Sequence, residues 1–351
     1  MTNRSRFGLL LAGALLPVGC HSADMQTKTP AAATAARPGA QLVGGVERLD
    51  PALDALVAPD ARPEVLARGY KWSEGPVWTG GAVLFSDVPN NVIWRWHEAE
   101  GVREFLRPSG YTGSVPRGGD PGSNGLAVDA AGRLYMCQHG DRRIARLAPD
   151  GKSFETVADR YQGKRFNSPN DLVVRPNGDV YFSDPIYGLP GHETDPAREI
   201  PWSGVYRARA GGGVDLLDKT LTYPNGLAFS PDGKTLYVAV SDPARAIWMA
   251  YDVDGDGGVS NGHVFFDATS FVKAGKKGLP DGMKIDVGGN LFATGPGGVF
   301  VFSAVGKHLG TIVTGEPTAN CAFGDDGGTL YMTANDKLTR IRLKTRGLVG
   351  K

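Results

Sequence analysis

One hairpin pattern occurs six times along the chain, and this repetition constrains the fold more than any other feature of the sequence. Each copy begins with a polar residue, continues through a small residue into an apolar strand, turns, and returns as a second apolar strand. We call the polar residue that begins each copy its head residue. The head residues are spaced 39 to 56 residues apart and are Glu74, Asn124, Asn170, Asn225, Asp281 and Asn320.

Turn sequences and extra strands complete each unit. Pairs typical of tight turns separate the strands in five copies: Ala131-Gly132, Asn177-Gly178, Asp232-Gly233, Gly288-Gly289 and Gly327-Gly328. A third apolar segment often follows, and the 50 Gly and 24 Pro residues agree with a fold rich in turns. We therefore predict an all-β fold, a six-bladed β-propeller with a central channel, over residues 41–351. The segment 40–70 is expected to supply the strand that closes the ring.

The first residues have the pattern of a secretory signal peptide. Arg4 and Arg6 precede an apolar run, residues 7–16, that is too short to span a bilayer permanently. The run leads into Leu-Pro-Val-Gly-Cys20, which resembles a bacterial lipobox, although Pro17 stands where Leu is usual. We expect residues 1–20 to be a signal peptide with cleavage before a lipidated Cys20. The protein would then be exported, in the periplasm or held at a membrane only through this lipid, with plain secretion as the alternative.

Residues 21–40 are mostly Ala, Thr, Pro and Gln, with almost no large apolar side chain. Such a composition is typical of a flexible tether. The globular part is therefore expected to begin near residue 41.

The head residues predict a metal site. The first strand of each propeller blade lines the channel, so heads at the same end of their strands would form a ring at one mouth. All six are carboxylates or carboxamides, and oxygen donors with two negative charges suit a hard divalent cation. The alternative, that Asn-Gly and Asp-Gly are only turn formers, explains one copy but not six in register. It also leaves Glu74, followed by Gly-Pro, unexplained.

The second strand of each hairpin returns to the same mouth. Its last residues are therefore candidates for the substrate pocket or for support of the ring: Asp87, His139, Asp184, Asp242 and Gly295. His139 would orient a substrate or move a proton, or would serve as a hydrogen-bonded wall residue. Cys137 and Cys321 belong to blades that are not neighbours, so we expect buried thiols rather than a disulfide.

Several other functions find no support in the sequence. The formal net charge of +1 gives no electrostatic reason to expect nucleic acid. No Gly-x-Ser-x-Gly elbow of a serine hydrolase is present. The stretch 252–257 matches the opening of an EF-hand loop, but the twelfth position is His263 rather than Glu, which favours a hairpin turn. No obligate protein partner is inferred.

Four motifs, in this order, resemble the gluconolactonase and senescence-marker-protein (regucalcin) family: Trp-Ser-Glu74-Gly-Pro, Ser-Pro-Asn170-Asp, Tyr-Pro-Asn225-Gly-Leu and Leu-Pro-Asp281-Gly-Met. The stretch 135–143 is similar to bacterial gluconolactonases, and the resemblance covers roughly residues 60–345. It implies a six-bladed propeller with a catalytic Ca²⁺ or similar ion. It further implies that Glu74, Asn225 and Asp281 bind this metal and that Asn170 contacts metal or substrate. Ser168 stands where regucalcin has an Arg that holds the sugar lactone, so that contact does not carry over.

Residues and resemblance together predict metal-dependent hydrolysis of a sugar lactone. The divalent cation, with Ca²⁺ as first choice and Mg²⁺, Mn²⁺ or Zn²⁺ as alternatives, would be held by Glu74, Asn170, Asn225 and Asp281. It would polarise the carbonyl while Asp281 activates water or, alternatively, acts as nucleophile. The substrate contacts would be Asn124, Asn170, His139 and Asp184. The rival hypotheses are an organophosphate or aryl-ester hydrolase with the same site, and a non-catalytic propeller that binds a ligand.

Overall fold

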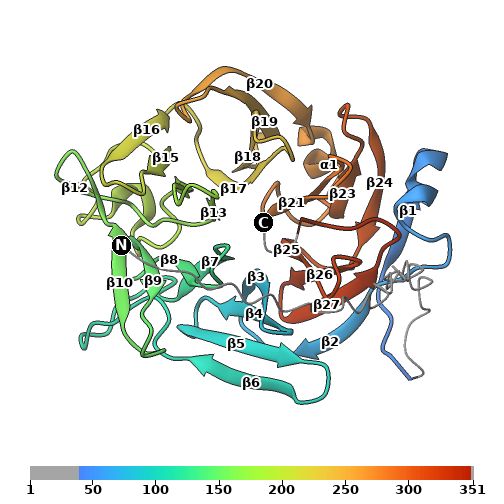
Figure 1. Ribbon diagram of the computed structural model, residues 1–351, viewed down its shortest axis with the longest axis horizontal. Helices are drawn as coiled ribbons and strands as arrows, with labels where there is room; N and C mark the ends of the chain where they lie inside the picture. The colour runs from blue at the N-terminus through green and yellow to red at the C-terminus, as the bar shows by residue number, and fades with distance from the viewer. Residues whose placement is uncertain (1–38, 349–351) are drawn as a thin grey trace, which may run out of the picture. The chain divides into compact units, whose positions relative to one another are not determined.

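The computed structural model describes residues 39–348, and β-strands form most of its regular structure. Six sheets are arranged around a central axis, as Figure 1 shows, with each successive sheet beside the previous one. The prediction of a six-bladed β-propeller is therefore confirmed. The predictions for residues 1–20, including lipidation of Cys20, lie outside the described residues, as does most of the expected tether.

The first four blades each contain four antiparallel strands that follow one another in sequence. Blade 1 consists of β3 (Ser73–Thr79), β4 (Ala82–Asp87), β5 (Val92–His97) and β6 (Gly101–Leu106). Blade 2 consists of β7 (Ser123–Val128), β8 (Leu134–Gln138), β9 (Arg143–Leu147) and β10 (Phe154–Ala158). Blade 3 consists of β13 (Leu172–Val174), β14 (Val180–Asp184), β15 (Gly204–Ala208) and β16 (Val214–Asp218). Blade 4 consists of β17 (Pro224–Phe229), β18 (Thr235–Asp242), β19 (Arg245–Val253) and β20 (Val259–Asp267).

The last two blades each take one strand from the N-terminal part of the chain. Blade 5 consists of β21 (Met283–Ile285), β22 (Leu291–Gly295), β23 (Gly298–Phe302) and β24 (His308–Val313), with β1 (Gly45–Arg48) paired to β24. Blade 6 consists of β25 (Thr318–Gly324), β26 (Thr329–Ala334) and β27 (Lys337–Arg342), with β2 (Glu64–Arg68) paired to β27. The expected closing strand is β2, and β1 adds a fifth strand to blade 5 that the sequence analysis did not foresee.

Short elements complete the structure. They are the 3-10 helices η1 (Pro51–Ala55) and η2 (His192–Thr194), the helix α1 (Thr269–Lys273), and a ribbon of β11 (Arg160–Tyr161) and β12 (Lys164–Arg165). None of the helices in residues 39–348 is long and apolar enough to cross a membrane.

The core lies between neighbouring blades, where the alternating apolar side chains of one sheet face those of the next. On the face of blade 3 that packs against blade 2, Phe182 stacks on Tyr206 with ring centroids 5.5 Å apart. Between blades 4 and 5, the buried Trp248 packs on Phe300 at 5.2 Å. Aromatic rings thus fill the wedge-shaped spaces between sheets that diverge from the axis.

Within the described residues, both cysteines are free and buried, as expected. Cys137 belongs to the cluster between blades 2 and 3, whereas Cys321 belongs to the cluster around blades 5 and 6. Burial raises the pKa of each thiol, so both behave as small apolar side chains.

Candidate active site

The head residues lie where the ladder of the innermost strand is irregular. In blade 1 the pairing register shifts between Glu74 and Val77, and comparable shifts follow the starts of β7, β17 and β25. In blades 3 and 5 the regular inner strand begins only after the heads Asn170 and Asp281. Such bulges redirect side chains that would otherwise alternate between the two faces of a sheet.

The residue after the head sets how closely the next blade approaches. A Cβ built on Gly226 would lie 2.3 Å from the carbonyl oxygen of Asp281, which no side chain could accommodate. The glycines that follow three other heads are crowded in the same way by the next blade: Gly75, Gly125 and Gly282. Glycine at this position therefore draws the heads of successive blades into one tight ring.

The ring opens into a cavity of about 580 Å³. Five head residues line this cavity, together with His139: Glu74, Asn124, Asn170, Asn225 and Asp281. The sixth head, Asn320, does not line it. Its amide nitrogen instead donates to Asp171 at 3.3 Å, and its amide oxygen accepts the backbone N–H of Cys321 at 2.9 Å.

Four buried oxygen atoms in the cavity wall have no hydrogen-bond partner, which is unusual because buried polar atoms are normally paired. They are the Oδ1 atoms of Asn124, Asn170, Asn225 and Asp281. The amide nitrogen of Asn225 is occupied by the Ser241 hydroxyl at 3.0 Å, which leaves its oxygen for the cavity. The oxygens of Asn170, Asn225 and Asp281 come from three blades, and a single cation bound to all three would pair them, which leaves the Asn124 oxygen for a hydrogen bond from a ligand.

The carboxylates of the site repel one another. Burial, followed by the charges of Glu74 and Asp171, raises the pKa of Asp281 well above its ordinary value. Burial and the charge of Asp171 also raise the pKa of Glu74, although the backbone N–H of Gly75 donates to its carboxylate at 2.8 Å and opposes this rise. A bound divalent cation would offset this repulsion and favour the ionised carboxylates.

The donor set is unlike that of a zinc cage. Among residues 39–348 there is no group of three or more His, Cys, Asp or Glu side chains arranged to hold a metal. The candidate ligands Glu74, Asn170, Asn225 and Asp281 instead combine two carboxylates with two amides. Oxygen-only sets of this kind suit Ca²⁺ or Mg²⁺, so the residues fit a hard cation.

His139 lies in the cavity wall as a buried and neutral side chain. Burial, with a smaller effect of the Arg117 charge, lowers the pKa of His139 to about 3. Its Nε2 is 3.5 Å from the amide nitrogen of Asn170, and its Nδ1 has no partner. A neutral imidazole with a free nitrogen suits hydrogen bonding to a substrate better than proton transfer near pH 7.

Asp184, which was predicted to contact substrate, does not line the cavity. Asp184 is fully buried behind the cavity wall, where its two oxygens accept the backbone N–H groups of Asn167 and Ser168, each at 2.8 Å. It therefore fixes the segment that leads to Asn170. Asp87 similarly accepts the backbone N–H of Trp72, just before Glu74, at 3.4 Å. Of the five residues expected where second strands end, only His139 lines the cavity.

Asp171 is a third carboxylate that the sequence analysis missed. It is buried, it accepts the amide of Asn320, and burial raises its pKa. Glycine follows four of the other head residues, whereas Asp171 follows Asn170. This departure from the Asn-Gly pattern is the sequence feature that could have indicated a third carboxylate. Its charge acts on both Glu74 and Asp281.

Further cavity residues come from outside the repeated pattern. They include Trp72, Asp120, Tyr187 and His192. Asp120 belongs to the connection 107–122 between β6 and β7, and Tyr187 and His192 belong to the connection 185–203 between β14 and β15. No repeat predicts the content of these connections, and only their length distinguishes them in the sequence.

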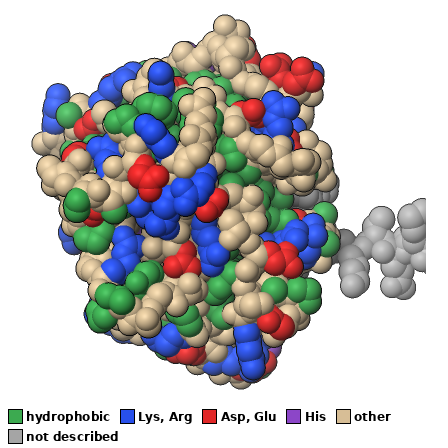
Figure 2. Space-filling view, turned by 90° about the vertical axis from the view of Figure 1, so that its left-hand side faces the viewer, with side chains coloured by type: hydrophobic (Ala, Val, Ile, Leu, Met, Phe, Trp, Pro, Cys, Tyr) green, Lys and Arg blue, Asp and Glu red, His purple; other side chains and the backbone are tan. Residues whose placement is uncertain are grey.

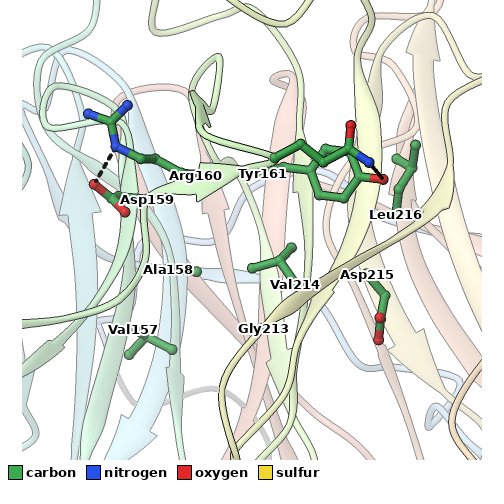
Figure 3. Close-up of a pocket in the computed structure, with 10 residues that line it drawn as sticks. Val157, Ala158, Asp159, Arg160, Tyr161, Gly213, Val214, Asp215 and Leu216 are labelled. Atoms are coloured by element: carbon green, nitrogen blue, oxygen red, sulfur yellow. Dashed lines mark hydrogen bonds and ion pairs between the residues drawn. The ribbon is translucent and has the colours of Figure 1, made fainter.

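A second hollow, of about 610 Å³, lies on the outside between β10–β11 and β16, and its lining is drawn in Figure 3. Its polar groups already have partners: Gln162 donates to the Tyr161 hydroxyl at 3.2 Å, and Asp215 accepts from Arg207 and Arg209. Figure 2 shows the same side of the molecule, where basic and acidic side chains lie close together. This hollow therefore lacks the unpaired groups that mark the channel mouth.

Comparison with known proteins gives consistent results. The model of the SMP-30/gluconolactonase/LRE-like region matches residues 72–336. A gluconolactonase from Zymomonas mobilis is 39% identical over 350 residues, which cover 98% of both chains. The structure of a gluconolactonase from Xanthomonas campestris superimposes with a TM-score of 0.75 at 33% identity, covering 88% of this chain and 99% of that one. A calcium-binding regucalcin from Agrobacterium tumefaciens shares the fold, with a TM-score of 0.62 at 20% identity, covering 88% of this chain and 96% of that one.

Proposed function

Because this chain belongs to the SMP-30/gluconolactonase/LRE-like family, we propose that it hydrolyses a sugar lactone with one divalent cation held by Glu74, Asn170, Asn225 and Asp281. Likeness to a gluconolactonase along the full chain supports the reaction class, a lactonase among carboxylic-ester hydrolases. The amide and carboxylate side chains of the head residues that line the cavity support a hydroxylated substrate. Ca²⁺ is the first choice of ion because all the candidate donors are oxygen atoms.

One observation carries the metal part of this proposal. Four buried side-chain oxygens from four blades face one cavity without a protein partner, beside three mutually repelling carboxylates. Leaving such groups unpaired costs free energy that a protein normally avoids. A hard cation bound to Asn170, Asn225 and Asp281 would pair three of these oxygens and offset the repulsion between the carboxylates, whereas a purely structural ring of turns would do neither.

In the proposed reaction, the cation acts on the lactone carbonyl and Asp281 moves the proton. A bound divalent cation would polarise the lactone carbonyl and stabilise the negative charge that develops on its oxygen. Asp281 takes a proton from the attacking water, whose oxygen bonds to the carbonyl carbon. The bond from that carbon to the ring oxygen then breaks, and Asp281 returns the proton to the ring oxygen to give a hydroxy acid.

The other side chains position the substrate. Asn124 and the neutral His139 each present an unpaired atom to the cavity and can hydrogen-bond the lactone. Asn170 serves as ligand and as substrate contact. Glu74 is held by the N–H of Gly75, so it is suited to binding the ion rather than to moving a proton.

The test is acid release from D-glucono-δ-lactone, measured in a pH-stat with and without EDTA. We expect hydrolysis above the spontaneous rate, its loss in EDTA, and recovery when Ca²⁺ is added. Asn225→Ala is expected to weaken metal affinity by at least the ~10–100-fold typical of altered metal sites. Asn177→Ala, at an exposed turn, is the matched control. Full activity in EDTA would refute the metal dependence, and absence of lactone hydrolysis would refute the function.

We also propose that the protein is exported and anchored through a lipid on Cys20. The Arg-flanked apolar run that ends at Gly19-Cys20 supports this proposal. Mass spectrometry of the native N-terminus tests it, with a lipid-modified Cys20 as the expected first residue. An unmodified Cys20, or cleavage elsewhere, would refute the anchor.

A further inference from the structure

Two connections outside the repeated pattern meet at the cavity. Gly119, in the connection 107–122, lies against Pro190, in the connection 185–203, where an added Cβ would be 3.3 Å from the Pro190 Cα. Arg117 fastens the same two segments, because its guanidinium donates to the carbonyl oxygens of Gly140 at 2.9 Å and Gly188 at 2.6 Å. The two connections therefore form one wall with a fixed relation to the site.

We propose that Asp120 and His192, on this wall, bind hydroxyl groups of the substrate and make the enzyme selective for polyhydroxylated lactones. The proposal rests on the lactonase function proposed above. Both side chains line the same cavity as the candidate metal ligands, although neither belongs to the ring of head residues.

The backbone around His192 is fixed while its side chain is left available. Asp195 accepts the N–H of Gly191 at 2.8 Å, and the neighbouring Glu193 accepts the Tyr223 hydroxyl at 2.6 Å. His192 itself has a φ of 49°, in the left-handed region that non-glycine residues rarely adopt. Its imidazole makes no hydrogen bond within the described residues, although it lines the cavity. Strained residues held by their surroundings often occur at ligand sites.

Asp120 is the complementary group on the facing connection. Its side chain is partly buried in the cavity wall, yet no protein group within residues 39–348 donates a hydrogen bond to it. Burial raises the pKa of Asp120, and the charge of His192 opposes this rise, so the two side chains lie within electrostatic reach. A carboxylate kept in a cavity wall without a donor is costly unless a ligand supplies one.

The two groups match the chemistry of adjacent hydroxyls. A carboxylate accepts hydrogen bonds from two hydroxyl groups, and an imidazole can donate one and accept one. A lactone without hydroxyls would cover Asp120 and leave its carboxylate unpaired, which is the arrangement that gives strong discrimination against such analogues. The pair therefore sets substrate class, while the head residues perform the reaction.

The experiment compares two lactones with the same six-membered ring, D-glucono-δ-lactone and δ-valerolactone, which lacks hydroxyls. For Asp120→Ala and His192→Ala, we expect KM for the sugar lactone to rise by about tenfold or more, as for loss of a hydrogen bond to a charged group. KM for δ-valerolactone should stay within about twofold in His192→Ala and should fall in Asp120→Ala, because the carboxylate that this substrate leaves unpaired is gone. The kcat for both lactones should stay within about twofold. Asp120→Asn should recover part of the loss. Asp256→Ala and His263→Ala, on the outer β19–β20 hairpin region, are the matched controls.

Equal losses on both lactones, or no change on either, would overturn the proposal. If the wild-type protein hydrolyses neither lactone, the proposed function fails, and a binding measurement still decides the role of the pair. That measurement is calorimetry with 1,5-anhydro-D-glucitol, which keeps the hydroxylated ring but has no carbonyl. Binding by the wild type that weakens about tenfold in Asp120→Ala supports the pair. No binding, or equal binding by both proteins, overturns it.

Discussion

At the scale of single residues, the two carboxylates of the ring differ in freedom rather than in charge. Glu74 is buried and accepts the N–H of Gly75, whereas Asp281 keeps one oxygen without a partner. Both carboxylates can bind a metal, but the one that keeps an unpaired oxygen can also accept a proton. The same residue types therefore support two different roles.

This difference predicts opposite outcomes when each charge is removed. Asp281→Asn keeps an oxygen donor but removes the base, so turnover at saturating Ca²⁺ should remain lower by about 10²–10⁴-fold. Glu74→Gln removes charge but no base, so its defect should lie mainly in Ca²⁺ affinity and recover partly with excess ion. Titrating Ca²⁺ into both variants while following lactone hydrolysis distinguishes them. Full recovery by Asp281→Asn, but not by Glu74→Gln, would mean that the two roles are exchanged.

Residues that share the repeat could be predicted, and residues outside it could not. Asn124, Asn225 and Asp281 were placed in one ring because six hairpins in register must begin at the same mouth. Asp184 shares that regularity, but whether its side chain faces the cavity or the loop behind it depends on local hydrogen bonds. Asp120 has no counterpart in other blades, so nothing in the repeat predicts that it lines the cavity.

At the scale of elements, the innermost strands combine a bulge with a following glycine. The bulge turns the head side chain, and the missing Cβ lets the next blade reach it. The position of each head side chain therefore depends on contacts between two blades rather than on one blade alone. A change in one strand should therefore affect the ligand on its neighbour.

Gly226→Ala tests this coupling. The added Cβ would meet the Asp281 carbonyl oxygen at 2.3 Å, so the Asp281 backbone must move. We expect a loss of about 1–3 kcal/mol in the free energy of unfolding and weaker Ca²⁺ binding in calorimetry. Gly211→Ala is the control, because no atom lies within 4 Å of its Cβ position. Unchanged Ca²⁺ affinity in Gly226→Ala would contradict the coupling.

The closing strand β2 predicts a second effect at this scale. Arg340 of β27 is buried and pairs with the buried Glu64 of β2 and with Glu98. Arg340→Met removes the cation that faces a buried carboxylate and should cost about 3 kcal/mol in urea unfolding. Arg209→Met removes an exposed partner of Asp215 and should cost less than about 1 kcal/mol. Equal costs would show that the closing pair contributes no more than a surface pair.

At the scale of the whole molecule, the channel mouth concentrates negative charge that the folded chain must tolerate. Glu74, Asp171 and Asp281 approach from three blades, and burial raises the pKa of each. The metal-free fold therefore holds protons more tightly than the unfolded chain. Its stability depends on pH in a way that the metal-bound fold should not share.

The sign of this dependence follows from the direction of the shifts. A carboxyl group whose pKa is higher in the folded than in the unfolded chain stabilises the fold fully at pH values below its unfolded pKa of about 4. This stabilisation is lost as the pH rises through the pKa of the folded state. Bound Ca²⁺ removes the loss, so the increase in melting temperature caused by Ca²⁺ relative to EDTA should grow between pH 5 and 8. His139, whose pKa is lowered, has the opposite sign but is present in both samples. A Ca²⁺ effect that shrinks with pH would contradict this account.

The overall architecture was predictable because it follows from the spacing of the repeated hairpins along the sequence. Strand-turn-strand units at this spacing have few other solutions, and a ring needs a strand from its far end to close. The place of β1 on blade 5 was not predictable, since four residues without a distinctive pattern can pair with any free edge. Its partner is β24, the outer strand that lies within reach of the segment leading to β2.

The pairing of β1 and β2 also sets an order in time. These strands leave the ribosome first, yet their partners β24 and β27 belong to the part of the chain that is made last. While synthesis continues, these two strands lack their native partners, and the ring stays open. The ring therefore closes only after the final blade has been released. A chain of this design has no closed ring until its last residues are available, so ring closure is a late step of folding.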